Sequence, residues 1–183
     1  MKQKLKTALA FTKNVFTTGA LSETSRKVEL EICHHLPTDK DITVVEFGMG
    51  HGNLTREILN TISSGSKLFT FEVNKEFCDH VHKTLPDPRL TIINDGAENL
   101  TTHVSEKIQG VIASIPFSFF SEEKGLEIIQ NAYDQLEINC FYSQVLYTKF
   151  NFKKFQTIFD ASELKKLSNF PPEYIYHCQK LAQ

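Results

Sequence analysis

Residues 44–55 read Val44-Val45-Glu46-Phe47-Gly48-Met49-Gly50-His51-Gly52-Asn53-Leu54-Thr55. In this stretch an apolar predicted strand contains an acidic residue, Glu46. Glycines follow at alternate positions, and a predicted helix begins directly after them. Glycine lets the backbone turn sharply and lets a ligand approach the main chain without meeting a Cβ atom. The first free N–H groups of the helix then face that ligand. The stretch therefore predicts a nucleotide-type site at the end of a β-strand.

The spacing of the glycines separates two kinds of nucleotide-type ligand. Dinucleotide folds use G-x-G-x-x-G, in which the third glycine allows close packing of helix on strand. In this chain Asn53 occupies that position. The pattern E-x-G-x-G-x-G instead resembles motif I of the class I S-adenosylmethionine (SAM) methyltransferases. The resemblance implies SAM as the cofactor, with Glu46 near its cationic methionine end. A dinucleotide site is the alternative, followed by a glycine turn that binds no ligand.

The composition is that of a globular α/β domain. The chain has 183 residues, 40% of them hydrophobic and 23% charged, and a net charge of −2. The net charge therefore excludes a surface that is basic all over. An anionic partner would have to bind at a local cluster of basic residues. The four scattered cysteines form no C-x-x-C pair, which predicts reduced thiols in a cytoplasmic protein and no metal. No apolar run reaches the roughly 20 residues of a membrane span, and no signal peptide is expected.

Strands and helices alternate along most of the chain, which argues for a parallel sheet. The fold class predicted is α/β: a doubly wound, mostly parallel seven-stranded sheet of the Rossmann-like class I methyltransferase type. An antiparallel C-terminal strand pair completes the sheet. Ser22 is the expected N-cap of the helix predicted at 23–35. Strands are predicted at 42–47, 67–73, 90–94, 108–114, 139–147, 162–169 and 173–180, and helices at 23–35, 53–62, 75–84, 122–136 and 151–158.

The chain divides into an N-terminal basic amphipathic segment, residues 1–21, and a methyltransferase domain, residues 22–183. Four lysines carry all the charge of the opening segment, and no carboxylate precedes Glu23. Apolar residues at helical spacing form one stripe of it. Such a segment can lie on an anionic membrane surface, or it can pack as a lid on its own domain.

Acidic residues stand where the predicted strands end, which is where ligands bind in doubly wound sheets. Glu72 ends the second strand, and its carboxylate can accept hydrogen bonds from both ribose hydroxyls. Asp95 ends the third strand and can accept from an adenine amino group, while the small residues after it let the ring lie against the backbone. The candidate cofactor-binding residues are Glu46, Gly48, Gly50, Gly52, Glu72, Asp95, Gly96, Ala97 and Ser114.

The loop after the fourth strand is the predicted reaction site. It reads Ser114-Ile115-Pro116-Phe117, and the proline holds it in one shape. The rRNA adenine dimethyltransferases carry N-L-P-Y here, where the asparagine grips the base amine and the tyrosine stacks on it. In this chain a hydroxyl replaces the amide and an aromatic ring is kept. Aromatic rings can also surround a methylated cation. The candidate catalytic residues are Ser114, Pro116, Phe117 and Tyr147.

Three stretches resemble the bacterial phospholipid N-methyltransferases instead. Residues 11–26 are similar to their N-terminal V-G-A-x-x-P-S-S region, 114–118 to their S-x-L-P-F loop, and 169–178 to their N-x-P-P-A-x-V-Y closing strand. The resemblance implies methylation of phosphatidylethanolamine or a related aminolipid. The expected partners are then an anionic membrane surface and an aminophospholipid. The enzyme would be cytoplasmic and bound peripherally to the inner membrane face.

The basic-aromatic run 147–155 follows the fifth strand and could also contact the membrane. The runner-up function is methylation of an adenine amine in RNA or DNA, in which this run would bind phosphates and bases. A non-catalytic SAM-binding module is third. The reaction is an in-line displacement at the methyl group, and Glu23, His51 and solvent all remain open as its general base.

Overall fold

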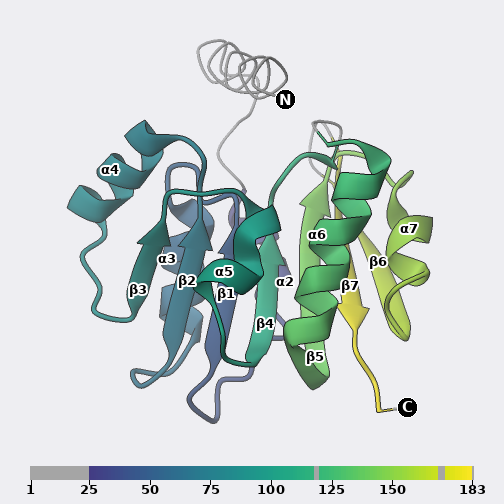
Figure 1. Cartoon of the computed structure of the whole chain (residues 1–183), viewed down its shortest axis with the longest axis horizontal. Helices are drawn as coiled ribbons and strands as arrows, with labels where there is room; N and C mark the ends of the chain where they lie inside the picture. Colours follow the sequence, from purple (N-terminus) through teal and green to yellow (C-terminus); the bar gives the residue numbers. More distant parts are fainter. Residues whose placement is uncertain (1–24, 118–119, 169–171, 183) are drawn as a thin grey trace.

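The computed structural model describes residues 25–117, 120–168 and 172–182, which form one sheet of seven strands (Figure 1). The strands are β1 (Thr43–Phe47), β2 (Lys67–Phe71), β3 (Leu90–Ile93), β4 (Ile108–Ala113), β5 (Leu136–Leu146), β6 (Ala161–Leu167) and β7 (Glu173–Gln179). Their spatial order is β3-β2-β1-β4-β5-β7-β6. The first five run parallel, and β7 runs antiparallel to β5 and β6. The predicted α/β fold with its antiparallel C-terminal pair is confirmed.

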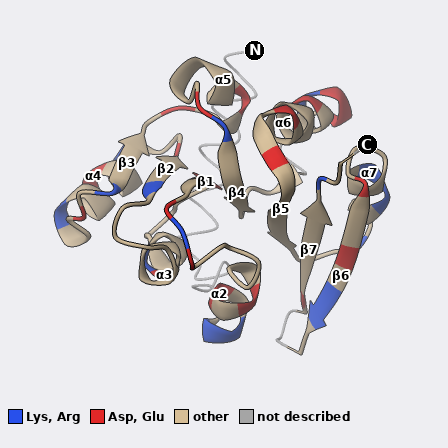
Figure 2. Cartoon of the chain, turned by 90° about the horizontal axis from the view of Figure 1, so that it is seen from below, with Lys and Arg blue, Asp and Glu red and all other residues tan. Residues whose placement is uncertain are grey.

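Two layers of helices cover the sheet because alternate residues of a buried strand point to opposite faces. Val44 packs against one layer, whereas Val45 and Phe47 pack against the other. Figure 2, viewed from below, separates the two layers and shows charged residues in both. The first layer contains α2 (Arg26–Ile32), α3 (Asn53–Thr61) and α4 (Lys75–Thr84), and the second contains α5 (Leu100–His103), α6 (Glu122–Gln135) and α7 (Phe152–Gln156).

The order of the strands places a switch point between β1 and β4. After β1 the chain builds β2 and β3 on one side, and then crosses back to add β4 on the other side. The loops that leave the carboxyl ends of these two strands therefore lead to opposite sides of the switch point, which is where doubly wound folds bind ligands. The glycine stretch 48–52 follows β1 and the loop 114–117 follows β4, so the fold brings both predicted site loops together.

Several predicted boundaries differ from the structure. The helix predicted at 23–35 begins at Arg26, because Ser25 is its N-cap and accepts a hydrogen bond from the Val28 N–H. β5 begins at Leu136 rather than 139, ahead of a register shift in its pairing with β4. Residues 97–103 form a 3-10 turn followed by α5, which were not predicted because such short helices carry no apolar periodicity.

The predicted N-terminal basic segment, residues 1–21, lies outside the described residues, as do Ser22 and Glu23. Within 25–117, 120–168 and 172–182, no helix combines the length and the apolar character that crossing a bilayer requires. All four cysteines of the chain are free and buried, and burial raises the pKa of each thiol.

A buried histidine of β7 makes the stability of the fold dependent on pH. The side chain of His177 is 1% exposed and its Nδ1 lies 2.8 Å from Ser143 Oγ. Its Nε2 lies 3.4 Å from Glu31 Oε1 but makes no hydrogen bond. Burial, with a smaller effect of neighbouring His35, lowers the pKa of His177 to about 4, although Glu31 acts in the opposite direction.

We therefore expect the free energy of unfolding to fall as the pH drops from about 6.5 toward 4. An unfolded histidine takes up its proton at about pH 6.5, whereas His177 stays neutral in the folded chain down to about pH 4. Each pH unit in this window contributes at most about 1.4 kcal/mol. Urea unfolding at pH 7 and pH 5 measures the loss. His177→Gln should lose about 2 kcal/mol less than the wild type over that interval, and equal losses would contradict the assignment.

Candidate active site

The glycine loop after β1 is held open by backbone geometry that side chains rarely adopt. Gly48, Gly50 and Gly52 have φ angles of +85°, +54° and +86°. The Gly48 N–H donates to the Phe71 carbonyl at 2.9 Å, which ties the loop to the end of β2. A Cβ atom at Gly50 would meet nothing within 4 Å. The main chain at Gly50 can therefore be approached directly by a ligand, as the sequence predicts.

Glu72, at the end of β2, faces this loop and organises it. One carboxylate oxygen accepts from the Gly50 N–H at 3.0 Å, and the other accepts from the Asn74 N–H at 2.8 Å. The carboxylate thus bridges the glycine loop and the start of α4, where Asn74 is the N-cap. Glu72 is partly exposed to solvent and lies beside the open space at Gly50. The structure therefore brings Glu72 and the glycines into one site.

Asp95, at the end of β3, is engaged by its own segment. Its Oδ1 accepts from the Gly96 N–H and from Asn99 Nδ2, both at 2.8 Å, and its Oδ2 lies 2.8 Å from His103 Nε2. The interaction with His103 lowers the pKa of Asp95 most strongly. These partners hold the carboxylate in one orientation, and Ala97, two residues further on, is buried. Adenine recognition by Asp95 stays a prediction.

Glu46 lies inside the domain, with no exposed surface. Its Oε2 accepts hydrogen bonds from Thr55 Oγ1 and Thr70 Oγ1, both at 2.7 Å, while Oε1 has no partner. Burial raises the pKa of the Glu46 carboxyl to about 7, against the opposing effect of the two threonines. The carboxyl therefore links β1 to β2 and to the first turn of α3. A direct contact between Glu46 and a cofactor would require a rearrangement.

The loop after β4 is fixed against the glycine loop by Ser114. Its N–H donates to the Phe47 carbonyl at 2.9 Å, and its Oγ donates to the Gly48 carbonyl at 2.7 Å. Gln144 of β5 donates to the Ile115 carbonyl at 3.1 Å. Ser114 thus joins the predicted reaction site to the predicted cofactor site, and Gln144, which the sequence did not single out, supports the loop from the neighbouring strand.

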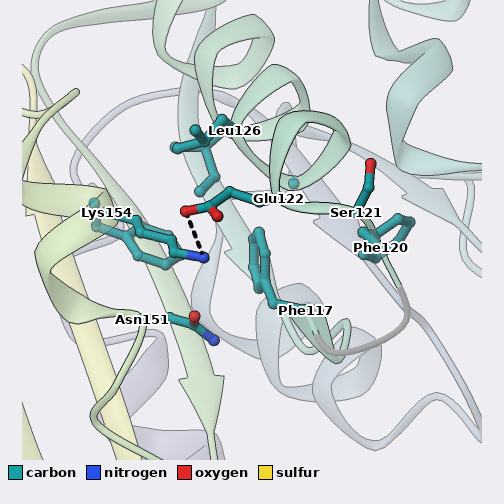
Figure 3. Close-up of a pocket in the computed structure, with 10 residues that line it drawn as sticks. Phe117, Phe120, Ser121, Glu122, Leu126, Asn151 and Lys154 are labelled. Carbon is teal, nitrogen blue, oxygen red and sulfur yellow. Dashed lines mark ion pairs between the residues drawn. The ribbon is translucent and has the colours of Figure 1, made fainter.

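Phe117 lies in the wall of a pocket between the β4–α6 connection and α7 (Figure 3). Its ring packs on Phe155 with centroids 5.4 Å apart. It also approaches Gly125 of α6 so closely that a Cβ there would lie 2.9 Å from the ring. Lys154 and Glu122, which form an ion pair 3.0 Å long, line the same pocket. The predicted stacking ring therefore borders a polar and aromatic pocket next to the reaction loop.

The basic-aromatic run after β5 divides into buried and exposed residues. Phe155 is fully buried, and its ring lies 5.2 Å from that of Tyr176, so this phenylalanine belongs to the core. Tyr147 is 40% exposed and Phe150 83% exposed. Tyr147 follows β5 at the same edge of the sheet as the loop 114–117. Only the exposed members of the run can meet a substrate.

Sequence reasoning did not single out Gln144 and His103, and it placed Lys154 in the basic-aromatic run without its partner. Gln144 supports a carbonyl 29 positions earlier, and Lys154 pairs with Glu122 across the pocket. His103 lies eight positions after Asp95, a spacing that places both on one side of the 97–103 turn, and this was the one local signal available. In the described parts of the chain, no group of three or more His, Cys, Asp or Glu side chains is placed to hold a metal ion.

The residues around the glycine loop fit SAM. The open backbone at Gly50 can lie against the cofactor, and Glu72 offers a carboxylate beside it. Ser114 joins this cofactor side to the acceptor loop. Together with the strand order, these features define a class I SAM-dependent methyltransferase.

Comparison with known proteins gives the family. The chain belongs to the ribosomal RNA adenine dimethylase family, whose model matches residues 16–165. It is therefore a SAM-dependent methyltransferase.

Solved structures share its fold. An rRNA methylase from Streptococcus thermophilus is 21% identical, with a TM-score of 0.67 over 88% of this chain and 100% of that one. A precorrin-6y C5,15-methyltransferase from Geobacter metallireducens is 15% identical, with a TM-score of 0.72 over 86% of this chain and 91% of that one. The N-methyltransferase NodS from Bradyrhizobium japonicum, in complex with S-adenosyl-L-homocysteine (SAH), is 8% identical, with a TM-score of 0.70 over 85% of this chain and 86% of that one.

Proposed function

We propose that this methyltransferase transfers the methyl group of SAM to an adenine amino group of RNA. The observation that carries the proposal is the match of residues 16–165 to the ribosomal RNA adenine dimethylase family, because that stretch contains both the glycine loop and the loop 114–117. The fold shared with the rRNA methylase from Streptococcus thermophilus supports the same substrate class. The sequence motifs alone favoured an aminolipid over an adenine amine as the acceptor, and the family match reverses this preference.

The acceptor loop suits an amine that is already neutral. Its side chains, Ser114, Ile115, Pro116 and Phe117, include none that titrates near neutral pH. The amino group of adenine is unprotonated at neutral pH, so no proton has to leave before the attack. Its lone pair is delocalised into the ring and becomes the nucleophile when hydrogen bonds hold the N–H groups, and the methylated nitrogen then releases one proton to solvent. An alkyl ammonium resembles the lysine side chain, with a pKa of about 10.4, and has to lose a proton before each attack. The loop therefore supports the adenine amine over the alkyl amine.

Ser114 and Ile115 are the residues that would orient the amine. The Ser114 hydroxyl donates its proton to the Gly48 carbonyl, so its lone pairs are available to accept one amine N–H. The Ile115 carbonyl accepts from Gln144 and retains a second lone pair for the other N–H. When bound, SAM supplies the electrophilic methyl group. The chain's own contribution is to hold the nitrogen in line with that methyl and to exclude water.

A second candidate acceptor is the amine of phosphatidylethanolamine or a related aminolipid. Ser114 and Phe117 favour it, because they stand where the adenine dimethyltransferases carry asparagine and tyrosine, and the loop resembles that of the phospholipid N-methyltransferases. Under this alternative, the basic segment 1–21 would hold the enzyme on the inner membrane face.

One assay separates the two acceptors. The full-length protein is incubated with methyl-labelled SAM and either ribosomal RNA stripped of protein or anionic vesicles that contain phosphatidylethanolamine. The proposal expects label in the RNA, recovered as methylated adenosine after digestion to nucleosides. Label in the lipid fraction alone would contradict it and establish the second candidate. The variant Glu72→Ala serves as the control for label that does not depend on the enzyme.

A further inference from the structure

The pocket beside the acceptor loop combines aromatic walls with one positive side chain. Phe117 and Phe120 come from the β4–α6 connection, and their ring centroids are 6.3 Å apart. Asn151 and Lys154 line the opposite side. In Figure 3 the Phe117 ring stands near the Lys154–Glu122 pair, with the Asn151 amide on the side of Lys154. A nucleotide-binding site requires two features. A flat apolar surface stacks on the base, and a nearby cation binds the phosphate.

The ion pair that crosses this pocket contributes little to folding. Lys154 Nζ lies 3.0 Å from Glu122 Oε1, and the side chains are 37% and 69% exposed. Exposed pairs of this kind are weak because water screens them. The lysine can therefore exchange its carboxylate partner for another anion at low cost. In that exchange Glu122 acts as an internal competitor of the incoming group.

The surface around the pocket is locally basic, in contrast to the chain as a whole. Residues 120–124 and 149–155 contain four lysines and two glutamates, a local charge of +2, whereas the whole chain carries −2. Lys149 and Lys153 are exposed, and Phe150 between them is 83% exposed. A polyanion that enters the reaction loop would thus meet positive charge and an exposed ring on this side.

We infer that this pocket is a nucleotide subsite, in which Lys154 binds the phosphate and Phe117 and Phe120 contact the base of a residue that neighbours the methylated adenine. The inference rests on the proposed function, because it assumes that the acceptor is RNA. A phosphate forms charge-assisted hydrogen bonds with a lysine ammonium, and it would replace Glu122 as the partner of Lys154. The substrate class at this subsite is single-stranded RNA.

Two substitutions in the ion pair should shift RNA affinity in opposite directions. The probe is a fluorescently labelled single-stranded RNA of twelve nucleotides with unpaired adenines, titrated by anisotropy against the full chain saturated with SAH. Lys154→Gln should weaken binding about fivefold at 0.1 M salt and lower the slope of log K against log salt by about one. Glu122→Gln should strengthen binding, because it removes the competitor and leaves the lysine in place.

Lys40→Gln is the matched control, since Lys40 is exposed ahead of β1, at the opposite edge of the sheet. It should change RNA affinity less than Lys154→Gln does. Removal of any nearby carboxylate raises affinity for a polyanion to some extent, and Glu123→Gln, at the exposed neighbouring position, measures that general effect. A gain for Glu122→Gln no larger than that of Glu123→Gln overturns the inference. So does unchanged affinity of Lys154→Gln, or a shift seen only in flotation with phosphatidylglycerol vesicles. Wild-type methylation of RNA is read separately, so that a failed subsite is distinguished from a failed substrate assignment.

Discussion

Replacing Glu72 with alanine is expected to weaken SAM and SAH binding by about tenfold or more. The carboxylate accepts hydrogen bonds from the Gly50 and Asn74 N–H groups and lies beside the open face of the glycine loop. Hydrogen bonds to a charged group contribute about 1.5–3 kcal/mol each. The substitution removes the predicted ribose contacts and also frees the loop that the cofactor has to meet in one shape. Isothermal titration with SAH measures the effect.

Glu76→Ala is the matched control for this experiment, because Glu76 is an exposed carboxylate in the first turn of α4. Its SAH affinity should stay close to that of the wild type. The thermal unfolding midpoint of Glu72→Ala, measured without SAH, shows whether the loss of binding reflects unfolding. A Glu72→Ala variant that binds SAH as tightly as Glu76→Ala would refute the role assigned to this carboxylate.

The second large effect separates two glycines of the same loop. Gly48→Ala is expected to lower the free energy of unfolding by about 2–4 kcal/mol, because it combines a left-handed backbone angle with overpacking. Its φ is +85°, and a Cβ there would lie 2.9 Å from Ile115 Cγ2 and 3.3 Å from Ser114 Oγ. The clash would displace the residues at which the cofactor loop and the acceptor loop contact each other.

Gly50→Ala should behave differently, although its φ of +54° is also left-handed. Its Cβ would enter open space, so only the backbone cost of about 1–2 kcal/mol applies to stability. That open space is where the cofactor is expected, and the added methyl group should weaken SAH binding by about tenfold or more. Urea unfolding and SAH titration of both variants test this division. Equal stability losses in the two variants would show that the clash at Gly48 relaxes.

Local patterns in the sequence were enough for most of the fold. The helix predicted at 75–84 has those bounds in the structure, because Asn74 caps it and Val81 and Cys78 fall on its buried side. The strands at 67–73 and 90–94 are close to the observed β2 and β3. In each case the residues that determine the element are adjacent in sequence, so propensity, capping and apolar spacing carry the information.

The same reasoning was less complete for the site. Glu72 was found because a carboxylate directly follows a strand, and the loop 114–117 because its motif is contiguous. The full burial of Glu46 could not be derived, because it depends on which segments the sheet brings together. The orientation of Asp95 by His103 depends on the helical turn at 97–103, which was not predicted. The run after β5 was predicted as one basic-aromatic surface, yet Phe155 belongs to the core and Phe150 to the surface.

The amino-acid sequence by itself determined the glycine loop, the alternation of strands and helices, and hence the methyltransferase class of this chain. These follow from interactions between neighbours along the backbone. Only the tertiary structure decided which polar groups of the site meet: Ser114 with the Gly48 carbonyl, and Lys154 with Glu122. Their partners lie tens of residues apart, and packing of the sheet and its two helical layers, rather than any local preference, sets those distances.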